Sequence, residues 1–403
     1  MNVGVVAPQS SHWDDSHRAA SILAKALRRL GHRAWLITSV FHDGAPAVEP
    51  ELVEKSERGF VELENDVAGV PALRVLSAKP LLPSGGVVLR NFSRILGEIV
   101  DLYGLDVVVV FSSFWNGPEE AAKWASVRRS LAAAGEAVRR SLFVYIPVYF
   151  TRFHVARPVE YASRVMWSTL NLPFILQQAD LVVACCQQEA GELRQFKAGS
   201  EKIVESRSWV DPEFAEALNA APADVPDGFD YVVSYVGPLR EDRNISGLVK
   251  IADKLQALGR IAVVAAGSGE AAAKFKREAK NRRNVLTVES HDVRLLASVV
   301  KSSVAGVDLS LYEPMGIRAL EYMYAGVPFA APPTSRAAWY VADGVDGIHL
   351  GSADDVDGFV RWIAALVQRP EVREEMGRRA QKKAEGLTAD KLAGLIVDSV
   401  RRL

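Results

Sequence analysis

The chain has 403 residues, of which 49% are hydrophobic and 24% charged, and its formal net charge is −1 at pH 7. This length is too great for one compact core and suits two domains. The balanced charge argues against nucleic acid as a partner of the whole protein. Its two cysteines, Cys185 and Cys186, are adjacent and too few for a disulfide framework, so we expect buried thiols and a reducing cytoplasm.

The N-terminal sequence MNVGVVAP runs directly into a strand-like segment, without the basic and apolar regions of a secretory signal. The longest uncharged apolar stretch lies between Arg164 and Asp180 and falls short of the roughly 20 residues that span a bilayer. No histidines and cysteines have zinc-like spacing, so we expect no bound metal. The resulting expectation is a cytoplasmic protein.

Short apolar runs alternate with segments of helical periodicity along the first half of the chain. This pattern predicts a strand at 3–7, a helix at 16–30 and a strand at 34–38. Continuous apolar runs predict buried parallel strands, because such strands are covered on both faces. These runs lie at 106–111, 142–148 and 180–185.

Residues 219–230, NAAPADVPDGFD, have the composition of a linker. A second alternating series follows, with strands predicted at 231–237, 261–267, 284–288, 306–311 and 327–331, a helix at 244–258 and a helical tail from 353. The sequence therefore predicts an α/β protein of two doubly wound Rossmann-like domains, 1–218 and 231–387, facing a central cleft. We expect a C-terminal helix, 388–403, to pack back on the first domain.

Residues 311–328, LYEPMGIRALEYMYAGVP, place Glu313 and Glu321 eight positions apart around a predicted helix start. Pro314 suits the first turn of a helix, and Gly316 lets a ligand approach the backbone. The free N–H groups at such a start form an anion site suited to phosphate. These groups belong to Met315, Gly316 and Ile317.

A simpler interpretation treats Glu313 as an ordinary helix-start acid and Glu321 as a solvated helix residue. Two arginines, Arg240 and Arg243, follow the strand at 231–237 and offer planar forks of donors to phosphate. Their simpler interpretation is a surface salt bridge with Glu241 or Asp242. The glycines of AAGSGE, 265–270, could wrap a base or phosphate, although such turns are common.

The segment from about 231 to 350 resembles the retaining glycosyltransferases of family 4, the glycogen-synthase-like group with the GT-B fold. The family's two glutamates with seven residues between them, and its Ala-Gly-x-Pro close, are matched by Glu313, Gly316, Glu321, Ala325, Gly326 and Pro328. The family's Gly-Arg-Leu-x-x-x-Lys-Asn loop is matched by Gly237, Leu239, Asn244 and, conservatively, Arg243. Pro238 replaces the family's first phosphate-binding arginine, for which we expect Arg240 to substitute, and Met315 replaces a phenylalanine.

The resemblance implies metal-independent transfer of a hexosyl group from a nucleoside diphosphate sugar to an acceptor hydroxyl, with retention and without a cofactor. Glu313 would contact the sugar hydroxyls and Glu321 the ribose, while Arg243 and the amides of Gly316 and Ile317 would hold the diphosphate. The catalytic set implied is Glu313, Arg243 and Arg240. The donor-binding set implied is Gly237, Gly267, Met315, Gly316, Ile317 and Glu321.

The first domain resembles the family less, and its first loop, PQSSHWDDSHRAA, lacks the family's glycines. One interpretation is a helix cap at Asp15 or Ser16. The other is that this loop recognises the acceptor. The acceptor-side candidates are His12, Trp13, Asp14, Asp15 and His17, with His154 a weaker one.

Residues 121–164 carry eight Lys and Arg against two Glu, a sum of +6, with aromatic residues among them. Such a face favours peripheral contact with an anionic membrane surface, or a lipid-linked acceptor glycan, at the inner face of the membrane. It is equally typical of a solvated basic surface. Two alternative functions remain: a nucleotide-sugar 2-epimerase, and a non-catalytic protein that binds a nucleotide sugar or glycan.

Overall fold

The computed structural model describes residues 1–12, 15–66, 69–78, 87–152, 158–206 and 209–403. Contacts divide the chain into two compact units. The first comprises Met1–Thr151, Pro158–Arg207 and Ala389–Leu403, and the second comprises Arg152–Arg157 and Ser208–Thr388. Each unit has its own hydrophobic core, and the two are described separately below.

The first unit is built on an eight-stranded sheet with the order β12-β11-β10-β9-β1-β2-β6-β5. Every pairing in it is parallel except β5 with β6. The strands are β1 (Asn2–Val6), β2 (Arg33–Ser39), β5 (Phe60–Leu63), β6 (Ala72–Val75), β9 (Val107–Phe111), β10 (Leu142–Ile146), β11 (Leu181–Ala184) and β12 (Ile203–Glu205). Two short hairpins accompany them, β3 (Phe41–His42) with β4 (Ala45–Pro46) and β7 (Ser77–Ala78) with β8 (Val88–Leu89).

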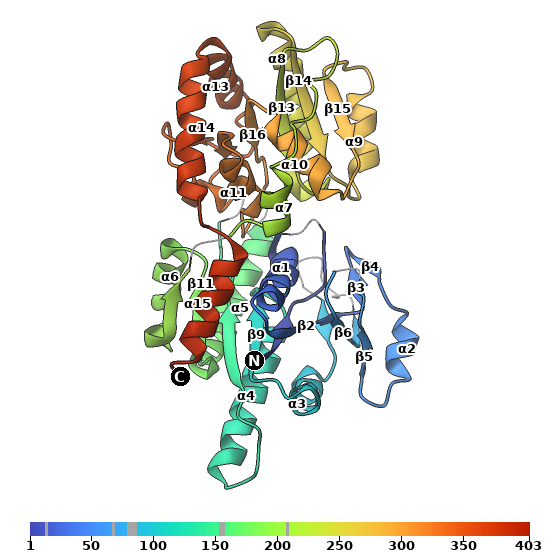
Figure 1. Cartoon of the computed structure of the whole chain (residues 1–403), viewed down its shortest axis with the longest axis vertical. Coiled ribbons are helices and arrows are strands. Elements are labelled where there is room, and N and C mark those ends of the chain that lie inside the picture. The colour runs from blue at the N-terminus through green and yellow to red at the C-terminus, as the bar shows by residue number, and fades with distance from the viewer. Residues whose placement is uncertain (13–14, 67–68, 79–86, 153–157, 207–208) are drawn as a thin grey trace. The chain divides into compact units, whose positions relative to one another are not determined.

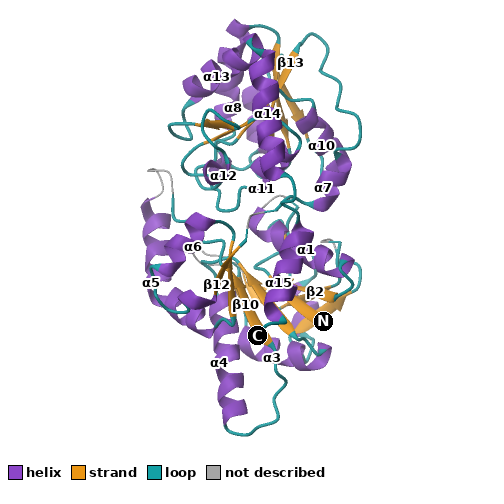
Figure 2. Cartoon of the chain, turned by 60° about the vertical axis from the view of Figure 1, so that its left-hand side comes forward, coloured by secondary structure: helices purple, strands orange, loops and turns teal. Residues whose placement is uncertain are grey.

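Helices flank this sheet (Figures 1 and 2). They are α1 (Asp15–Arg29), α2 (Pro50–Glu54), α3 (Phe92–Tyr103), α4 (Gly117–Ala133), α5 (Pro158–Gln178), α6 (Gln187–Arg194) and the C-terminal α15 (Ala389–Val400). The last of these packs on α1, where Arg29 and Asp390 form an ion pair of 2.8 Å. Strand β9, VVVVF, is buried throughout, as expected of a parallel strand covered on both faces.

The second unit has a six-stranded, wholly parallel sheet with the order β15-β14-β13-β16-β17-β18. Its strands are β13 (Tyr231–Val236), β14 (Ile261–Ala266), β15 (Val285–Val288), β16 (Ala305–Val307), β17 (Phe329–Ala331) and β18 (Gly347–His349). Its helices are α7 (Pro212–Ala217), α8 (Ser246–Leu255), α9 (Ala272–Ala279), α10 (Val293–Lys301), α11 (Ile317–Tyr324), α12 (Ala337–Tyr340), α13 (Val356–Gln368) and α14 (Pro370–Ala384).

The predicted fold class, two doubly wound α/β units, is confirmed, and each predicted strand appears within a few residues of its expected place. The antiparallel edge made by β5 and β6 was missed, because short half-exposed strands give a weak apolar signal. The composition-based boundary at residue 218 differs from the contacts, since α7 packs against α10 within the second unit. Cys185 and Cys186 are buried, as expected.

Each sheet has a point at which the direction of winding reverses. In the first sheet it lies between β1 and β9, and in the second between β13 and β16. Ligands of open α/β sheets bind outside the carboxyl ends of the strands at such a point. The loops after β1, β9, β13 and β16 are therefore the places where topology predicts binding sites. Among the described helices, none combines the length and apolar character needed to cross a membrane.

Candidate functional site

The loops at the second unit's reversal point bring Arg243 and Glu313 together. Arg243 lies at the end of the loop after β13, and Glu313 lies in the loop after β16. The Arg243 guanidinium donates to Oε2 of Glu313, and both residues are buried, at 4% and 7% exposure. The sequence placed both residues in the donor site, and the structure joins them in one contact.

The carboxylate of Glu313 also accepts from the backbone at the approach to α11. Its Oε1 receives the N–H groups of Met315, at 2.9 Å, and Gly316, at 3.2 Å. Two of the three amides that were predicted to be free for an anion, those of Met315 and Gly316, are therefore bound to Glu313. The simpler interpretation of Glu313 as a capping acid is partly right, but capping does not account for its burial against Arg243.

Helix α11 begins at Ile317, three residues later than expected. Pro314 therefore lies in the preceding loop and not in the first helical turn. Gly316 caps the helix with φ of +71°, and a Cβ at this position would lie 2.9 Å from the backbone nitrogen of Ala337. Both the left-handed conformation and the close approach of another loop require glycine here.

Glu321 is 1% exposed and accepts from Arg318, one turn earlier, at 2.8 Å. The interpretation of Glu321 as a solvated helix residue is therefore wrong. A buried carboxylate needs a partner to offset the cost of removing its charge from water, and Arg318 is such a partner. The sequence analysis did not single out Arg318, although its position three residues before Glu321 was a readable signal.

The structure separates the two arginines that the sequence treated alike. Arg240 is partly exposed and makes a two-pronged contact with Asp242, its Nε lying 3.0 Å from Oδ1. The simpler interpretation of a surface salt bridge is therefore right for Arg240. Arg243 instead points into the protein toward Glu313.

The glycines of the site bring two loops into backbone contact. A Cβ on Gly267 would lie 1.8 Å from the carbonyl oxygen of Gly237, and Gly237 donates to the carbonyl of Ala266. Burial raises the pKa of Tyr235, whose hydroxyl donates to the Pro238 carbonyl at 2.7 Å. These contacts give the two glycines a structural reason that does not depend on a ligand.

A third loop, which sequence reasoning missed, supports Glu313. The Glu313 N–H donates to the carbonyl of Thr334, and the Arg336 N–H donates to the carbonyl of Glu313. Tyr340 donates to the carbonyl of Met315 at 3.0 Å. Arg336 is fully buried and stacks on the ring of Trp339. The available signal was position: this loop follows β17, at the same carboxyl edge of the sheet.

The acceptor-side candidates of the first unit are only partly described. His12 is exposed at the carboxyl end of β1, and His17 is half-buried on α1 with Nδ1 3.4 Å from Nε2 of Gln9. Asp15 is the first residue of α1, and its side chain lies outside the description, so the expected helix cap stays a prediction. Trp13, Asp14 and His154 lie outside the described residues.

Four of the eight cations of the basic segment 121–164 are paired with acids of the first unit. The pairs are Lys123 with Glu120, Arg128 with Asp101, Arg129 with Asp180 and Arg139 with Asp106. Local charge counting overlooked these partners, because most of them are distant in sequence. The segment's net charge therefore overstates the positive potential of this surface.

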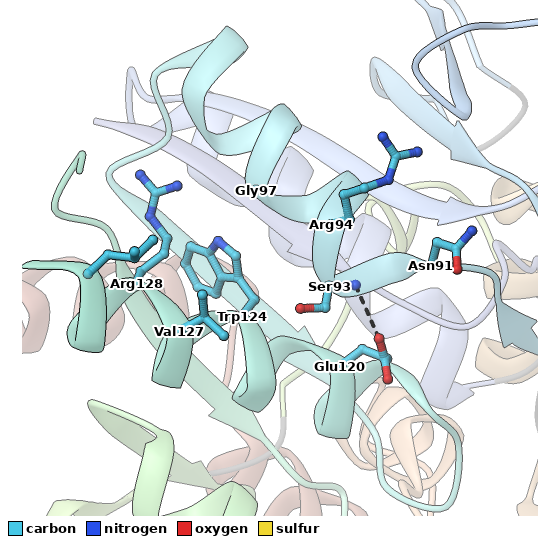
Figure 3. A pocket seen from close by; sticks show the side chains of 9 residues that line it. Asn91, Ser93, Arg94, Gly97, Glu120, Trp124, Val127 and Arg128 are labelled. Carbon is cyan, nitrogen blue, oxygen red and sulfur yellow. Dashed lines mark hydrogen bonds between the residues drawn. The ribbon is translucent and has the colours of Figure 1, made fainter. Parts of the chain in front are cut away.

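A cavity of about 680 Å³ lies between α3 and α4 (Figure 3). Trp124, Val127 and Arg128 of α4 line it, and Glu120 accepts from the backbone of Ser93 at its edge. The cavity is lined by none of the predicted site residues. It is therefore separate from the candidate donor site of the second unit.

Comparisons with known proteins point to the glycosyltransferases. Residues 223–383 match the family model of glycosyl transferases group 1. Sucrose-phosphate synthase of Thermosynechococcus elongatus matches with a TM-score of 0.68 and 16% identity, over 100% of this chain and 98% of that one. HepE of Anabaena, solved with UDP, matches with a TM-score of 0.64 and 14% identity over 100% of both chains.

The catalytic domain of starch synthase IV from Arabidopsis thaliana, bound to ADP and acarbose, matches with a TM-score of 0.63 and 14% identity, over 100% of this chain and 98% of that one. A search of curated proteins finds no match. The chain thus has the GT-B fold of glycosyltransferases. Its second unit, which holds the candidate site, is the part that matches glycosyl transferases group 1.

Proposed function

We propose that the protein is a retaining glycosyltransferase of the family 4 type, moving a hexosyl group from a nucleoside diphosphate sugar to an acceptor hydroxyl. The observation that carries the proposal is the buried contact between Arg243 and Glu313 at the carboxyl ends of β13 and β16. The match of residues 223–383 to glycosyl transferases group 1 supports it. So do similar folds solved with UDP and UDP-glucose.

In this proposal the protein's main task is electrostatic. Negative charge grows on the departing diphosphate as the sugar becomes oxocarbenium-like. We assign Arg243, Arg240 and the amides near Gly316 to that charge, since fixed donors stabilise a growing charge with little reorganisation. This role requires Arg243 and the amides of Met315 and Gly316 to share their contacts with Glu313 between that residue and the donor. Glu313 is oriented by Arg243 to accept from the sugar hydroxyls, and Glu321 accepts from the ribose.

We assign no protein nucleophile, metal or cofactor to this reaction. The donor phosphate takes the acceptor proton, as the resemblance to family 4 implies. The acceptor side falls to the first unit, where the loop after β1 lies at the sheet's reversal point. His12 is the described candidate there for contact with an acceptor glycan.

The proposed acceptor is a glycan carried on a lipid or membrane surface, reached from the cytoplasmic side. An outward face of α5 supports this part of the proposal, since Val159, Met166 and Leu170 are 73%, 62% and 70% exposed. Exposed apolar clusters of this kind mark interaction sites. The membrane proposal therefore rests on this apolar face of α5 and no longer on the charge of segment 121–164. Cosedimentation with anionic vesicles tests it, with Met166→Ser and Leu170→Ser expected to weaken binding.

The transferase proposal is tested by incubating the chain with UDP-, GDP- and ADP-sugars and a panel of glycan acceptors. Mass spectrometry detects the product, and NMR assigns its anomeric configuration. Glu313→Gln is expected to abolish transfer, whereas Glu289→Gln, which alters an exposed pair with Lys276, is expected to leave it unchanged. Epimer formation without an acceptor, or donor binding without turnover, would support the alternative functions instead.

A further inference from the structure

Two histidines and an aspartate converge in the first unit. His12 follows β1, while His42 and Asp43 belong to the β3–β4 hairpin that follows β2. One ligand atom from each residue lies within 4.8 Å of the other two. We propose that these three side chains form a binding site for a divalent transition metal, with zinc as the probe. The proposal does not rest on the transfer reaction, but it gives His12, the described acceptor-side candidate, a second role.

The first argument for a metal site is the spacing of the ligand atoms. Nε2 of His42 lies 3.3 Å from Oδ2 of Asp43. That separation is long for a charge-assisted hydrogen bond, which is usually about 2.7–2.9 Å. It matches two ligands about 2.0–2.1 Å from one tetrahedral zinc, which lie roughly 3.3 Å apart. The His12 ring meets the His42 ring edge-on, with centroids 4.5 Å apart, and its ligand atom lies within 4.8 Å of those of His42 and Asp43.

A buried network orients His42 from behind. Its Nδ1 lies 2.7 Å from the hydroxyl of Ser10, which is fully buried and accepts from Arg74 at 2.8 Å. Arg74 is itself fully buried, pairs with Asp66 and donates to the carbonyls of Ser39 and Phe41. The proposed site requires the tautomer in which Nδ1–H donates to Ser10 and Nε2 offers its lone pair to the metal. Histidine ligands are held by this kind of outer contact.

Asp43 is held in place by the hairpin turn and by hydrogen bonds to its carboxylate. Asp43 and Gly44 form the two-residue turn of the hairpin, with positive φ at both positions, as such turns require. The carboxylate accepts from the hydroxyl of Ser11 and from the N–H of His12, at 3.2 Å for the latter. These contacts tie the loop after β1 to the hairpin. Two imidazoles and a carboxylate leave a fourth position open to water or another oxygen ligand.

The test is zinc binding by the full chain without a histidine tag, measured by competition with a chromophoric chelator. We expect one zinc per chain, weakened at least tenfold in His12→Ala and in His42→Ala, and unchanged in His291→Ala, which alters a histidine outside the group. His12 is exposed, so its variant is expected to fold, and melting temperature checks each variant.

Cobalt provides a second readout, because a bound cobalt ion in a tetrahedral site absorbs visible light. The same two variants should lose this absorption. Absence of stoichiometric zinc binding in the wild-type chain overturns the proposal. So does binding that is equally tight in His12→Ala, His42→Ala and wild type, since the metal would then be held elsewhere.

Discussion

The guanidinium of Arg243 contacts the carboxylate of Glu313 across 70 positions of sequence, and both side chains are buried. The sequence alone predicts that removing either residue lowers turnover far more than stability. The contact changes that expectation, because removal of one partner leaves a buried charge without compensation. Loss of one member of such a pair costs about 3–5 kcal/mol.

We therefore expect Arg243→Ala and Glu313→Ala each to lower the free energy of unfolding by several kcal/mol, about 3–5. The double variant should recover much of that loss while remaining inactive. Urea unfolding measures the first quantity and sugar transfer the second. Glu289→Ala, at an exposed pair, is the control, with little effect on either. Transfer at the wild-type rate in either single variant would rule out the assigned site.

Arg240 should behave differently from Arg243. Its contact with Asp242 is partly exposed, and exposed ion pairs contribute about 0–1 kcal/mol. Arg240→Ala should therefore leave the melting temperature nearly unchanged while weakening nucleoside diphosphate binding about tenfold, since a charged hydrogen bond is worth about 1.5–3 kcal/mol. Isothermal titration measures the affinity. Arg282→Ala, which breaks a surface pair with Asp253, is the matched control, and equal affinities in the two variants would remove Arg240 from the site.

Gly316 and Gly344 allow backbone strain to be separated from steric clash. Their φ angles are nearly equal, +71° and +69°, but an added Cβ meets Ala337 only at Gly316. Gly344→Ala should cost about 1–2 kcal/mol from the left-handed conformation. Gly316→Ala should cost more and should also abolish donor binding, because the loop carrying Glu313 must shift. Equal losses of stability in the two variants would show that the contact with Ala337 is unimportant.

Glu119 should make stability depend on pH. Burial raises the pKa of Glu119, while a hydrogen bond from Trp167 at 2.6 Å opposes the rise. The folded state therefore binds a proton more tightly than the unfolded state. The stabilisation from this group is complete below the unfolded value near 4.5 and is lost as pH rises through the folded pKa.

Replacing Glu119 with glutamine keeps an acceptor for Trp167 and removes the charge. We expect Glu119→Gln to melt at a higher temperature than wild type at neutral pH. The difference should vanish as pH falls well below about 4.5, where Glu119 is neutral in both states. Melting curves across this range measure it. A difference that is constant with pH would mean that the charge of Glu119 is not the cause.

Local pattern was enough where chemistry is local. Continuous apolar runs such as 107–111 predicted buried parallel strands, because such strands are hydrophobic on both faces. The spacing of Glu313 and Glu321, with glycine at 316, located the candidate site because the chemistry of a helix start is also local in sequence. The weak edge strand β5 and the late start of α11 escaped, since neither is fixed by hydrophobic periodicity.

Long-range contacts escaped the sequence reading for one physical reason: partners distant along the chain leave no local signal. Arg240 and Arg243 read alike, yet one pairs at the surface and the other is buried against Glu313. The cations of 121–164 read as a basic face, yet three of them pair with acids of α3 and of loops that are distant in sequence. His12 and His42 are far apart in sequence, so no metal spacing was visible.

The sequence by itself determined the alternation of strands and helices, the two-unit organisation and the loop on which Glu313 lies, because these follow from hydrophobic period and backbone chemistry. Tertiary structure decided which charges are paired, which are buried and which loops meet. Those outcomes depend on the points where the winding of each sheet reverses, between β13 and β16 and between β1 and β9. There, segments that are distant in sequence meet at one carboxyl edge of the sheet.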